Sequence, residues 1–250
     1  MTRDLIRRFL SGVGVFLLIA VVGELASRGG LLDSQLLPAP SAVAAAFVDG
    51  IMSGLFAEHL SATLVRLAYG LALAVAIGVP LGVAIGLSRT LRGVAWPIVV
   101  FLYPIPVSVL IPLAIAMFGF ATSLYAALVA LTAGIPMVMA AADAVQRVSP
   151  VLIETGRTLG VRAHRIPLRI VLPAALPALI HGVFVAVSLG VIVLITGEIL
   201  VSSRGIGHLI VLAQRSYRLP DMYAAVALVG AFGALVTFST RLPMRSLTPR

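Results

Sequence analysis

Long apolar runs separated by short polar segments dominate this chain. The runs lie near residues 9–26, 60–87, 94–118, 122–144, 174–201 and 222–240. Each approaches or exceeds the length of about 20 residues that a helix needs to cross a bilayer. Because backbone polar groups in lipid must be satisfied within the segment, each run is predicted to be α-helical. The pattern predicts an all-α integral membrane protein with about six transmembrane helices.

The run at 94–118 is interrupted by four prolines, which are Pro97, Pro104, Pro106 and Pro112. An internal proline removes a backbone hydrogen bond and clashes with the carbonyl four residues earlier, so this span is expected to be bent or broken. Broken backbone at membrane depth is tolerated where it packs within protein or lines a water-filled cavity. The pattern is compatible with a mere kink against a neighbour and with a segment that lines a cavity.

Two further patterns predict local structure near the first long span. Residues 31–60 are moderately apolar and interrupted by prolines, which is typical of an external stretch with a short helix that Ser41 would cap. In the run at 60–87, Gly78, Gly82 and Gly86 are four residues apart. Glycines at this spacing form one small-residue stripe, which favours close packing against another helix.

Arginine placement predicts the orientation of the chain, because basic residues favour cytoplasmic loops. One side of the predicted spans receives Arg3, Arg7, Arg8, Arg89, Arg92, Arg147, Arg157, Arg162, Arg165, Arg169, Arg241, Arg245 and Arg250. The opposite side receives Arg28, Arg204, Arg215 and Arg218, with Arg66 just inside a span. Thirteen arginines against five indicate that both termini and the segment 147–172 face the cytoplasm.

Composition supports the membrane assignment and excludes several classes of protein. Of the 250 residues, 60% are hydrophobic and 11% are charged, against about 25% charged in soluble domains. All 18 basic residues are arginine, so a phosphate-binding loop with its essential lysine is excluded. The absence of cysteine excludes disulfides and thiolate metal sites. The net charge of +9 is attributed to the positive-inside bias, and we expect no nucleic acid partner.

The N-terminal residues superficially resemble a signal peptide, with arginines, an apolar run and then small residues. The apolar run from Phe9 to Ala26 has about 18 residues, which suffices to span about 30 Å of hydrocarbon. We expect a retained first span rather than a cleaved signal.

The polar segment 147–172 stands between two spans and reads "ETGRTLGVRAHRIPLRIVLP" from Glu154 to Pro173. Ser149 and Pro150 are typical of a helix start, and Gly160 suits the left-handed residue just after a helix end. A helix of about ten residues is marginal alone in water and needs a surface to pack on. A second short element, "AHRIPLRIVLP", follows it. The alternative is an ordinary basic loop held near lipid headgroups.

This segment closely resembles the cytoplasmic EAA loop of permease subunits of binding-protein-dependent ABC importers. Glu154, Gly160, Leu172 and Pro173 fall on the positions of that motif with the expected spacing. The resemblance extends from about Leu36 to Ile210, and "YPIPVSVLIPLAIAMFGF" and "GEILVSSRGIGHLI" are similar to the nitrate, sulfonate and taurine branch.

The chain departs from the pattern of that branch at several positions. Thr155 and Gly156 stand where alanines are usual, and a glycine there is expected to weaken a helix by about 1 kcal/mol against alanine. Ala163 replaces a common capping serine, and Pro167 is unexpected inside the second helix. The branch usually has a tryptophan shortly after the Pro-x-Pro of the third span, and this chain lacks it. The identity of the solute therefore does not follow from the resemblance.

The resemblance implies the type I ABC importer permease fold in a single transmembrane domain, residues 1–250. That domain has an N-terminal helix at 9–26, a core at 60–240 and a coupling loop at 147–172. It implies a coupling helix whose ATPase contacts are Glu154, Thr155, Gly156, Arg157, Thr158, Leu159 and Gly160. The implied partners are two ABC ATP-binding subunits that hold ATP and Mg, a periplasmic or lipid-anchored solute-binding protein, a second permease copy and membrane lipid. The implied location is the bacterial cytoplasmic (inner) membrane.

The expected mechanism is alternating access for a small anionic solute, namely nitrate, taurine or another sulfonate, with a small aromatic or pyrimidine precursor as the alternative. Candidate residues of the translocation pathway are Pro104, Pro106, Ser108, Ser188, Thr196 and Glu198. Glu198 stands out because an ionisable residue within a span is costly, although pairing with an external arginine is an equal alternative.

No catalytic or metal-ligating constellation is evident, and the ATPase activity is expected on the partner. A proton-coupled secondary transporter and a membrane enzyme are the rival classes.

Overall fold

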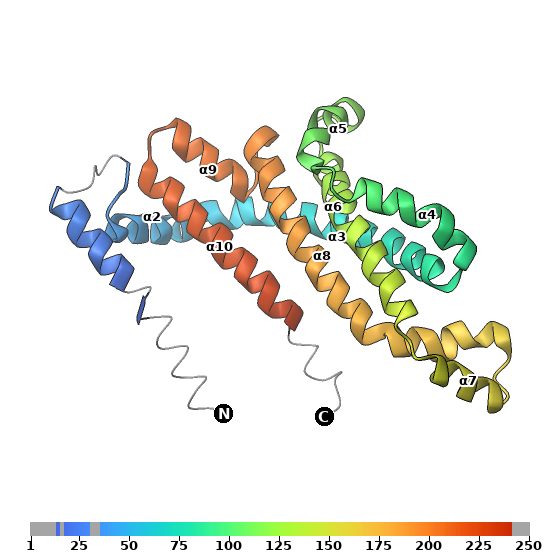
Figure 1. The fold of residues 1–250 in the computed structure, drawn as a ribbon. Coiled ribbons are helices and arrows are strands. Elements are labelled where there is room, and N and C mark those ends of the chain that lie inside the picture. Colours follow the sequence, from blue (N-terminus) through green and yellow to red (C-terminus); the bar gives the residue numbers. More distant parts are fainter. Residues whose placement is uncertain (1–13, 16–17, 31–35, 242–250) are drawn as a thin grey trace.

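The computed structural model describes residues 14–15, 18–30 and 36–241 of the chain (Figure 1). Within these ranges all the regular elements are helices. They are residues 18–28 and then α2 (Pro40–Met52), α3 (Leu55–Leu87), α4 (Arg89–Leu102), the 3-10 turn η1 (Val107–Leu110), α5 (Ile111–Phe118), α6 (Thr122–Gln146), α7 (Pro150–Thr158), the 3-10 turn η2 (Ala163–Arg165), the π turn η3 (Pro167–Val171), α8 (Leu172–Val201), α9 (Ile206–Arg215) and α10 (Leu219–Arg241). The all-α prediction is confirmed.

Four stretches of the described chain are long and apolar enough to cross a membrane: α3, α6, the continuous stretch that contains α8, and α10. A fifth span results if α4 and the segment Val107–Phe118 are counted as one bent unit. The first predicted run, 9–26, lies partly outside the described residues, and its described part from residue 18 onward is helical.

The centre of the fold is α6, which packs against α3 on one side and α8 on the other. The glycine stripe of α3 makes this packing possible. A Cβ on Gly82 would overlap the carbonyl oxygen of Val138, and a Cβ on Gly86 would lie 2.7 Å from Cβ of Val145. Side chains there would push the two helices apart, so the predicted packing role of the stripe is confirmed.

The proline-rich span is broken, as predicted. Helix α4 and the segment formed by η1 and α5 meet at an angle of 85°. Pro104 and Pro106 occupy the break, where they remove backbone donors that a continuous helix would use. The break places irregular backbone beside α6 and α8.

The predicted cap of the short helix in residues 31–60 is wrong by two residues. Helix α2 begins at Pro40, and Ala39 is its N-cap residue. The reason is that proline is pre-organised for the first helical position and starts the helix earlier. Ser41 instead binds Glu24, with its backbone N–H 2.9 Å from Oε2 and its hydroxyl 2.8 Å from Oε1.

Two short helices lie at opposite ends of the molecule. Figure 1 shows α7 at the lower right and α9, with its turn into α10, at the upper left. Helix α8 runs between these two ends, and its 30 residues correspond to about 45 Å at the usual rise per residue. Helix α8 therefore connects the end of the molecule at which α7 lies with the end at which α9 begins.

Candidate coupling and translocation sites

Helix α7 is terminated by a Schellman turn. The Gly160 N–H donates to the Arg157 carbonyl and the Val161 N–H donates to the Gly156 carbonyl, both at 3.0 Å. Gly160 has φ +80°, a left-handed conformation in which a residue without a Cβ avoids a steric clash. The prediction that Gly160 ends this helix in a left-handed conformation is confirmed. At the other end Ser149 is the N-cap residue but makes no side-chain capping bond, so helix initiation rests on Pro150.

One face of α7 is fixed to the span that follows. Ile153 and Val161 pack into an apolar cluster with Val145, Val148, Ile166 and Ile170. Gly156 is buried in this contact, and a Cβ there would overlap Cδ1 of Ile170. Glycine at this position gives the Ile170 side chain room against α7, because a methyl group there would displace Cδ1 of Ile170.

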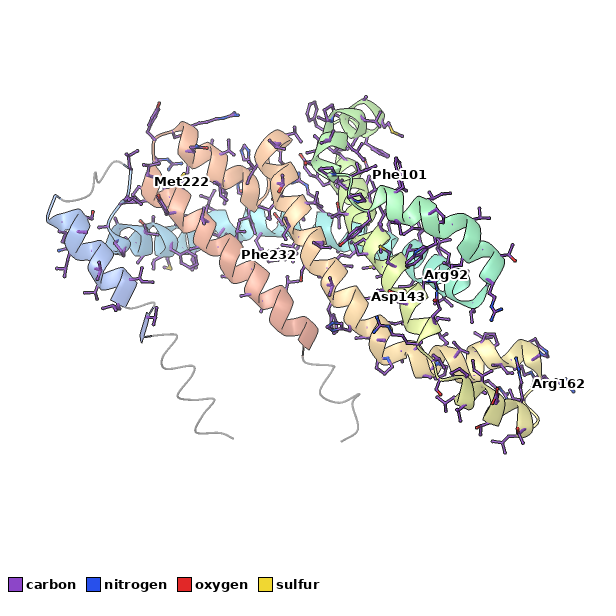
Figure 2. The ribbon with its side chains drawn as sticks, viewed as in Figure 1. Arg92, Phe101, Asp143, Arg162, Met222 and Phe232 are labelled. Carbon is purple, nitrogen blue, oxygen red and sulfur yellow. The ribbon has the colours of Figure 1, made fainter. Side chains whose placement is uncertain are left out.

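The opposite face of α7 is exposed. Glu154, Thr155, Arg157 and Thr158 are accessible, and Leu159 is 77% exposed. Val151 and Leu152 are also exposed apolar residues on this helix. Figure 2 labels Arg162 at the tip of the same protrusion. Exposed apolar side chains ringed by polar ones are typical of a protein-binding surface.

The second element of the coupling segment differs from the prediction. Residues 163–171 form the 3-10 turn η2 and the π turn η3, and η3 runs directly into α8. Pro167 is the first residue of η3, so it does not interrupt a helix interior, where its missing N–H would be harmful. The protrusion is therefore one short helix, α7, and an irregular return into α8.

A cavity of about 340 Å³ lies at the break between α4 and α5. Four of the predicted pathway residues line it, namely Pro104, Pro106, Ser108 and Thr196. Tyr103 and Thr132 add two more hydroxyl groups to its wall. None of its described lining residues carries a charge. The cavity is an uncharged space with scattered hydroxyl groups, bounded by backbone from which proline has removed donors.

Thr132 is a pathway candidate that the sequence did not reveal. Its Oγ1 is the buried side-chain polar atom for which the described structure provides no hydrogen-bond partner. A single threonine within the apolar run of α6 carries no signal by itself, since threonine hydroxyls commonly bond their own helix. Its importance depends on the neighbouring break, which only the folded chain brings close.

Two predicted pathway residues lie outside the lining of this cavity. The Ser188 hydroxyl donates to the Phe184 carbonyl of its own helix at 3.2 Å. Glu198 is fully buried in an ion pair, with Arg66 Nη1 2.8 Å from its Oε1. Its arginine partner belongs to α3 and not to the loop after α8, in which a partner is expected from the sequence. The fold therefore brings four of the six predicted pathway residues to one cavity, namely Pro104, Pro106, Ser108 and Thr196. Ser188 and Glu198 are not among its lining residues.

The Arg66–Glu198 pair is the centre of a buried polar network. The Thr63 hydroxyl is 3.0 Å from both oxygens of Glu198, and the Gly207 N–H donates to Oε2 at 3.1 Å. Arg66 also donates to the Arg204 carbonyl at 2.7 Å, and its guanidinium carbon lies 3.9 Å from the centre of the Tyr125 ring. The network ties α3 and α8 to the start of α9.

Backbone close to Glu198 explains the Gly-x-Gly sequence before α9. A Cβ on Gly205 would overlap the Glu198 carboxylate, and a Cβ on Gly207 would lie 2.8 Å from Cβ of Glu198. The Gly205 N–H also donates to Nδ1 of His59 at 3.1 Å. The participation of His59 and Thr63 had no sequence signal, whereas the paired glycines are a signal from which a close backbone approach could have been predicted.

These features define a class of membrane protein: a helical permease with a protruding docking helix and a broken span. Residues 78–250 match the family described as binding-protein-dependent transport system inner membrane component, and the chain belongs to this family. It is a permease subunit of an ABC importer, whose ATPase is a separate subunit.

Individual relatives are similar over most of their length. The taurine transport system permease protein TauC of Escherichia coli (strain K12) is 28% identical over 97% of this chain and 90% of that protein. The permease protein SsuC of the same strain, which is assigned to aliphatic sulfonate transport, is 34% identical over 90% of this chain and 85% of that protein. A chain of the MetNI methionine ABC transporter, solved in an inward-facing conformation, matches with a TM-score of 0.67 and 20% identity, over 75% of this chain and 94% of that one. The type I importer fold is thereby confirmed.

Proposed function

We propose that this permease carries a small anionic solute, most favourably taurine or another sulfonate, across the cytoplasmic membrane by alternating access. Two copies of the chain would form the pathway at their interface, and two ATP-binding subunits holding ATP and Mg would drive it. The chain itself would perform no catalysis. A soluble or lipid-anchored binding protein would deliver the solute on the external side. The arginine distribution supports an orientation with α7 and both termini in the cytoplasm.

The observation that carries this proposal is the two-sided character of α7. Its exposed face offers Glu154, Arg157 and Leu159 to a partner, while Gly156 packs its other face against Ile170. A partner can shift a conformational equilibrium only through different contacts in the two states. In the proposed mechanism the ATPase binds the segment Glu154–Gly160, and the Gly156–Ile170 contact passes its motion to α8.

The cavity at the broken span is the proposed solute contact within the pathway. Ser108 and Thr132 can donate a hydroxyl hydrogen to a sulfonate or nitrate oxygen. The Thr196 hydroxyl donates to the Ile192 carbonyl of its own helix at 2.9 Å, so it can only accept. A fixed positive charge would hold an anion tightly, whereas transport requires binding weak enough for release. The uncharged lining is consistent with passage of a solute whose selection takes place on the binding protein. The names of the TauC and SsuC relatives favour sulfonates among the candidate anions.

The first experiment is purification of the tagged chain from its native membranes after in-membrane crosslinking, followed by measurement of ATP hydrolysis. Recovery of an ATP-binding subunit together with ATP turnover is the expected result. Uptake of labelled taurine, nitrate and a pyrimidine precursor then identifies the solute. Uptake driven by a proton gradient without ATP would contradict the proposal and support a secondary transporter.

Thr132→Val tests the pathway assignment with a nearly isosteric change. The hydroxyl has no partner in the described fold, so its removal should leave the amount of folded protein unchanged. We expect uptake to fall by roughly tenfold, the factor for loss of one hydrogen bond of about 1.4 kcal/mol. Ser188→Ala is the matched control, because that hydroxyl lies outside the cavity lining. Equal uptake by both variants would exclude Thr132 from the pathway.

A further inference from the structure

The turn between α9 and α10 has an unusual residue at its left-handed position. Tyr217 has φ +54° and is the single non-glycine residue with positive φ in the described chain. Its N–H donates to the Gln214 carbonyl at 3.1 Å, and the Arg218 N–H donates to the Ala213 carbonyl at 3.0 Å. This is the bonding pattern of a Schellman turn, in which glycine is strongly preferred at the position that Tyr217 occupies.

The side chain at this strained position is not packed against the fold. The Tyr217 side chain is 91% exposed, so its ring adds little packing to the folded chain. A backbone outlier that the fold does not require points to a function of the side chain. Tyrosine and arginine are the residues most enriched at energetically important centres of protein interfaces. Arg215 and Arg218 flank Tyr217, and both are exposed.

A recess lies close to Tyr217, and hydrogen bonds hold the start of α9 in place. Arg218 pairs with Asp221 at 3.2 Å, and both residues line a recess of about 250 Å³ between α2, α9 and α10. Arg215 forms no ion pair with any described residue. The start of α9 is held by the buried network of Arg66 and Glu198. The ring therefore projects from a rigid turn beside a recess and an available positive charge.

We infer that the α9–α10 turn is the docking site for the soluble solute-binding protein, with Tyr217 as its central anchor. This inference rests on the proposed function, since it requires the turn to face the external side. The matching surface of the binding protein should be an apolar pocket for the tyrosine ring with a carboxylate at its rim for Arg215. Tyrosine suits such a role because it buries a large area at low cost in side-chain entropy.

A lipid headgroup is the other environment in which exposed tyrosines are common. The neighbours of Tyr217 favour a protein partner. Gln214, Arg215, Ser216 and Arg218 are all exposed polar residues, so the turn presents a continuous polar surface with a single aromatic ring. A segment that inserts into the headgroup region would carry apolar residues beside the ring.

The test uses the complete importer in nanodiscs with the soluble binding protein that stimulates its ATP hydrolysis. The half-saturating concentration of binding protein is measured for wild type, Tyr217→Gly and Tyr217→Phe. For Tyr217→Gly we expect this concentration to rise by at least about tenfold, with the maximal rate within about twofold and a melting temperature no lower than wild type. Tyr217→Phe keeps the ring and should stay within about threefold of wild type.

Phe120→Ala is the matched control, because Phe120 is an exposed aromatic residue in the turn before α6. It should leave the half-saturating concentration unchanged. If Tyr217→Gly folds poorly, Tyr217→Asn becomes the deciding variant, since asparagine tolerates the left-handed conformation.

An unchanged half-saturating concentration in the glycine variant overturns the inference. If that unchanged value comes with a lower melting temperature in nanodiscs, the ring contacts lipid headgroups instead. Failure of any binding protein to stimulate the wild-type complex would refute the proposed function itself. A stimulated complex in which the variant behaves like wild type would refute the docking site alone.

Discussion

Helices α7 and α9 end in the same hydrogen-bonded turn but use different residues at its left-handed position. Gly160 occupies that position after α7 with φ +80°, and Tyr217 occupies it after α9 with φ +54°. Glycine adopts this conformation freely, whereas a residue with a Cβ loses about 1–2 kcal/mol. The comparison indicates that the turn after α7 is optimised for its fold and that the turn after α9 retains a costly side chain for another purpose.

The two helices are also held by different forces. Helix α7 is fixed by apolar packing of Ile153 and Gly156 against the residues that lead into α8. The start of α9 is fixed by buried charges, through Arg66 and Glu198. Apolar packing is non-directional, whereas separating a buried ion pair leaves an uncompensated charge and costs several kcal/mol. This difference suits a helix that must move with a partner and a turn that must present a fixed surface.

Charge reversal on the exposed face of α7 should have the largest effect. Glu154→Arg is expected to abolish solute uptake while the protein remains folded in the membrane, because the side chain is exposed and makes no ion pair with a described residue. Uptake and membrane content are measured in parallel. Glu154→Gln removes the charge without reversing it and should give an intermediate rate. Wild-type uptake by the arginine variant would exclude this face from ATPase coupling.

Breaking the buried pair near α9 should have the next largest effect. Arg66→Met leaves the Glu198 carboxylate buried without its cation, a change that typically costs about 3–5 kcal/mol of stability. Thermal unfolding of the purified protein measures this loss. Arg204→Met is the matched control, since its pair with Glu58 is exposed and should contribute less than about 1 kcal/mol. Similar losses in both variants would contradict the distinction between the buried and the exposed pair.

Substitutions at the two left-handed positions should have opposite signs. Gly160→Ala places a Cβ at φ +80° and should destabilise the chain by about 1–2 kcal/mol. Tyr217→Gly removes a Cβ from the equivalent position and should stabilise it by about 1 kcal/mol. Both are measured as changes in thermal unfolding under the same conditions. A loss of stability in both variants would mean that the Tyr217 ring supports the fold, contrary to its exposure.

The smallest effect is expected where α7 touches the residues before α8. Gly156→Ala should change the stability by less than about 1 kcal/mol, because the helix propensity that alanine adds opposes the displacement of Ile170 Cδ1 by the new methyl group. Ile170→Val removes that atom, so the double variant should recover both the stability and the uptake rate. Recovery measures the coupling between the two residues in a double-mutant cycle. Additive effects would show that the close contact has no influence on transport.

Much of the architecture follows from the sequence alone. Runs of apolar residues long enough to cross the bilayer force helices, because lipid offers no partners to backbone groups. Pro104 and Pro106 predict the break in the third span, and Gly160 predicts the end of α7, since each acts through local backbone sterics. The glycine stripe of α3 predicts a close helix contact for the same reason, although not that α6 would be the partner.

Tertiary structure decided which distant groups meet. Arg66 and Glu198 are 132 residues apart in the chain, and no local rule pairs an arginine of one span with a glutamate of another. The unpartnered hydroxyl of Thr132 and the strained backbone of Tyr217 likewise appear only when the helices are assembled. Local sterics and hydropathy are properties of a few consecutive residues, so a sequence reveals them. Burial, hydrogen-bond satisfaction and backbone strain depend on the whole packed chain, and these properties identified the candidate pathway and docking residues.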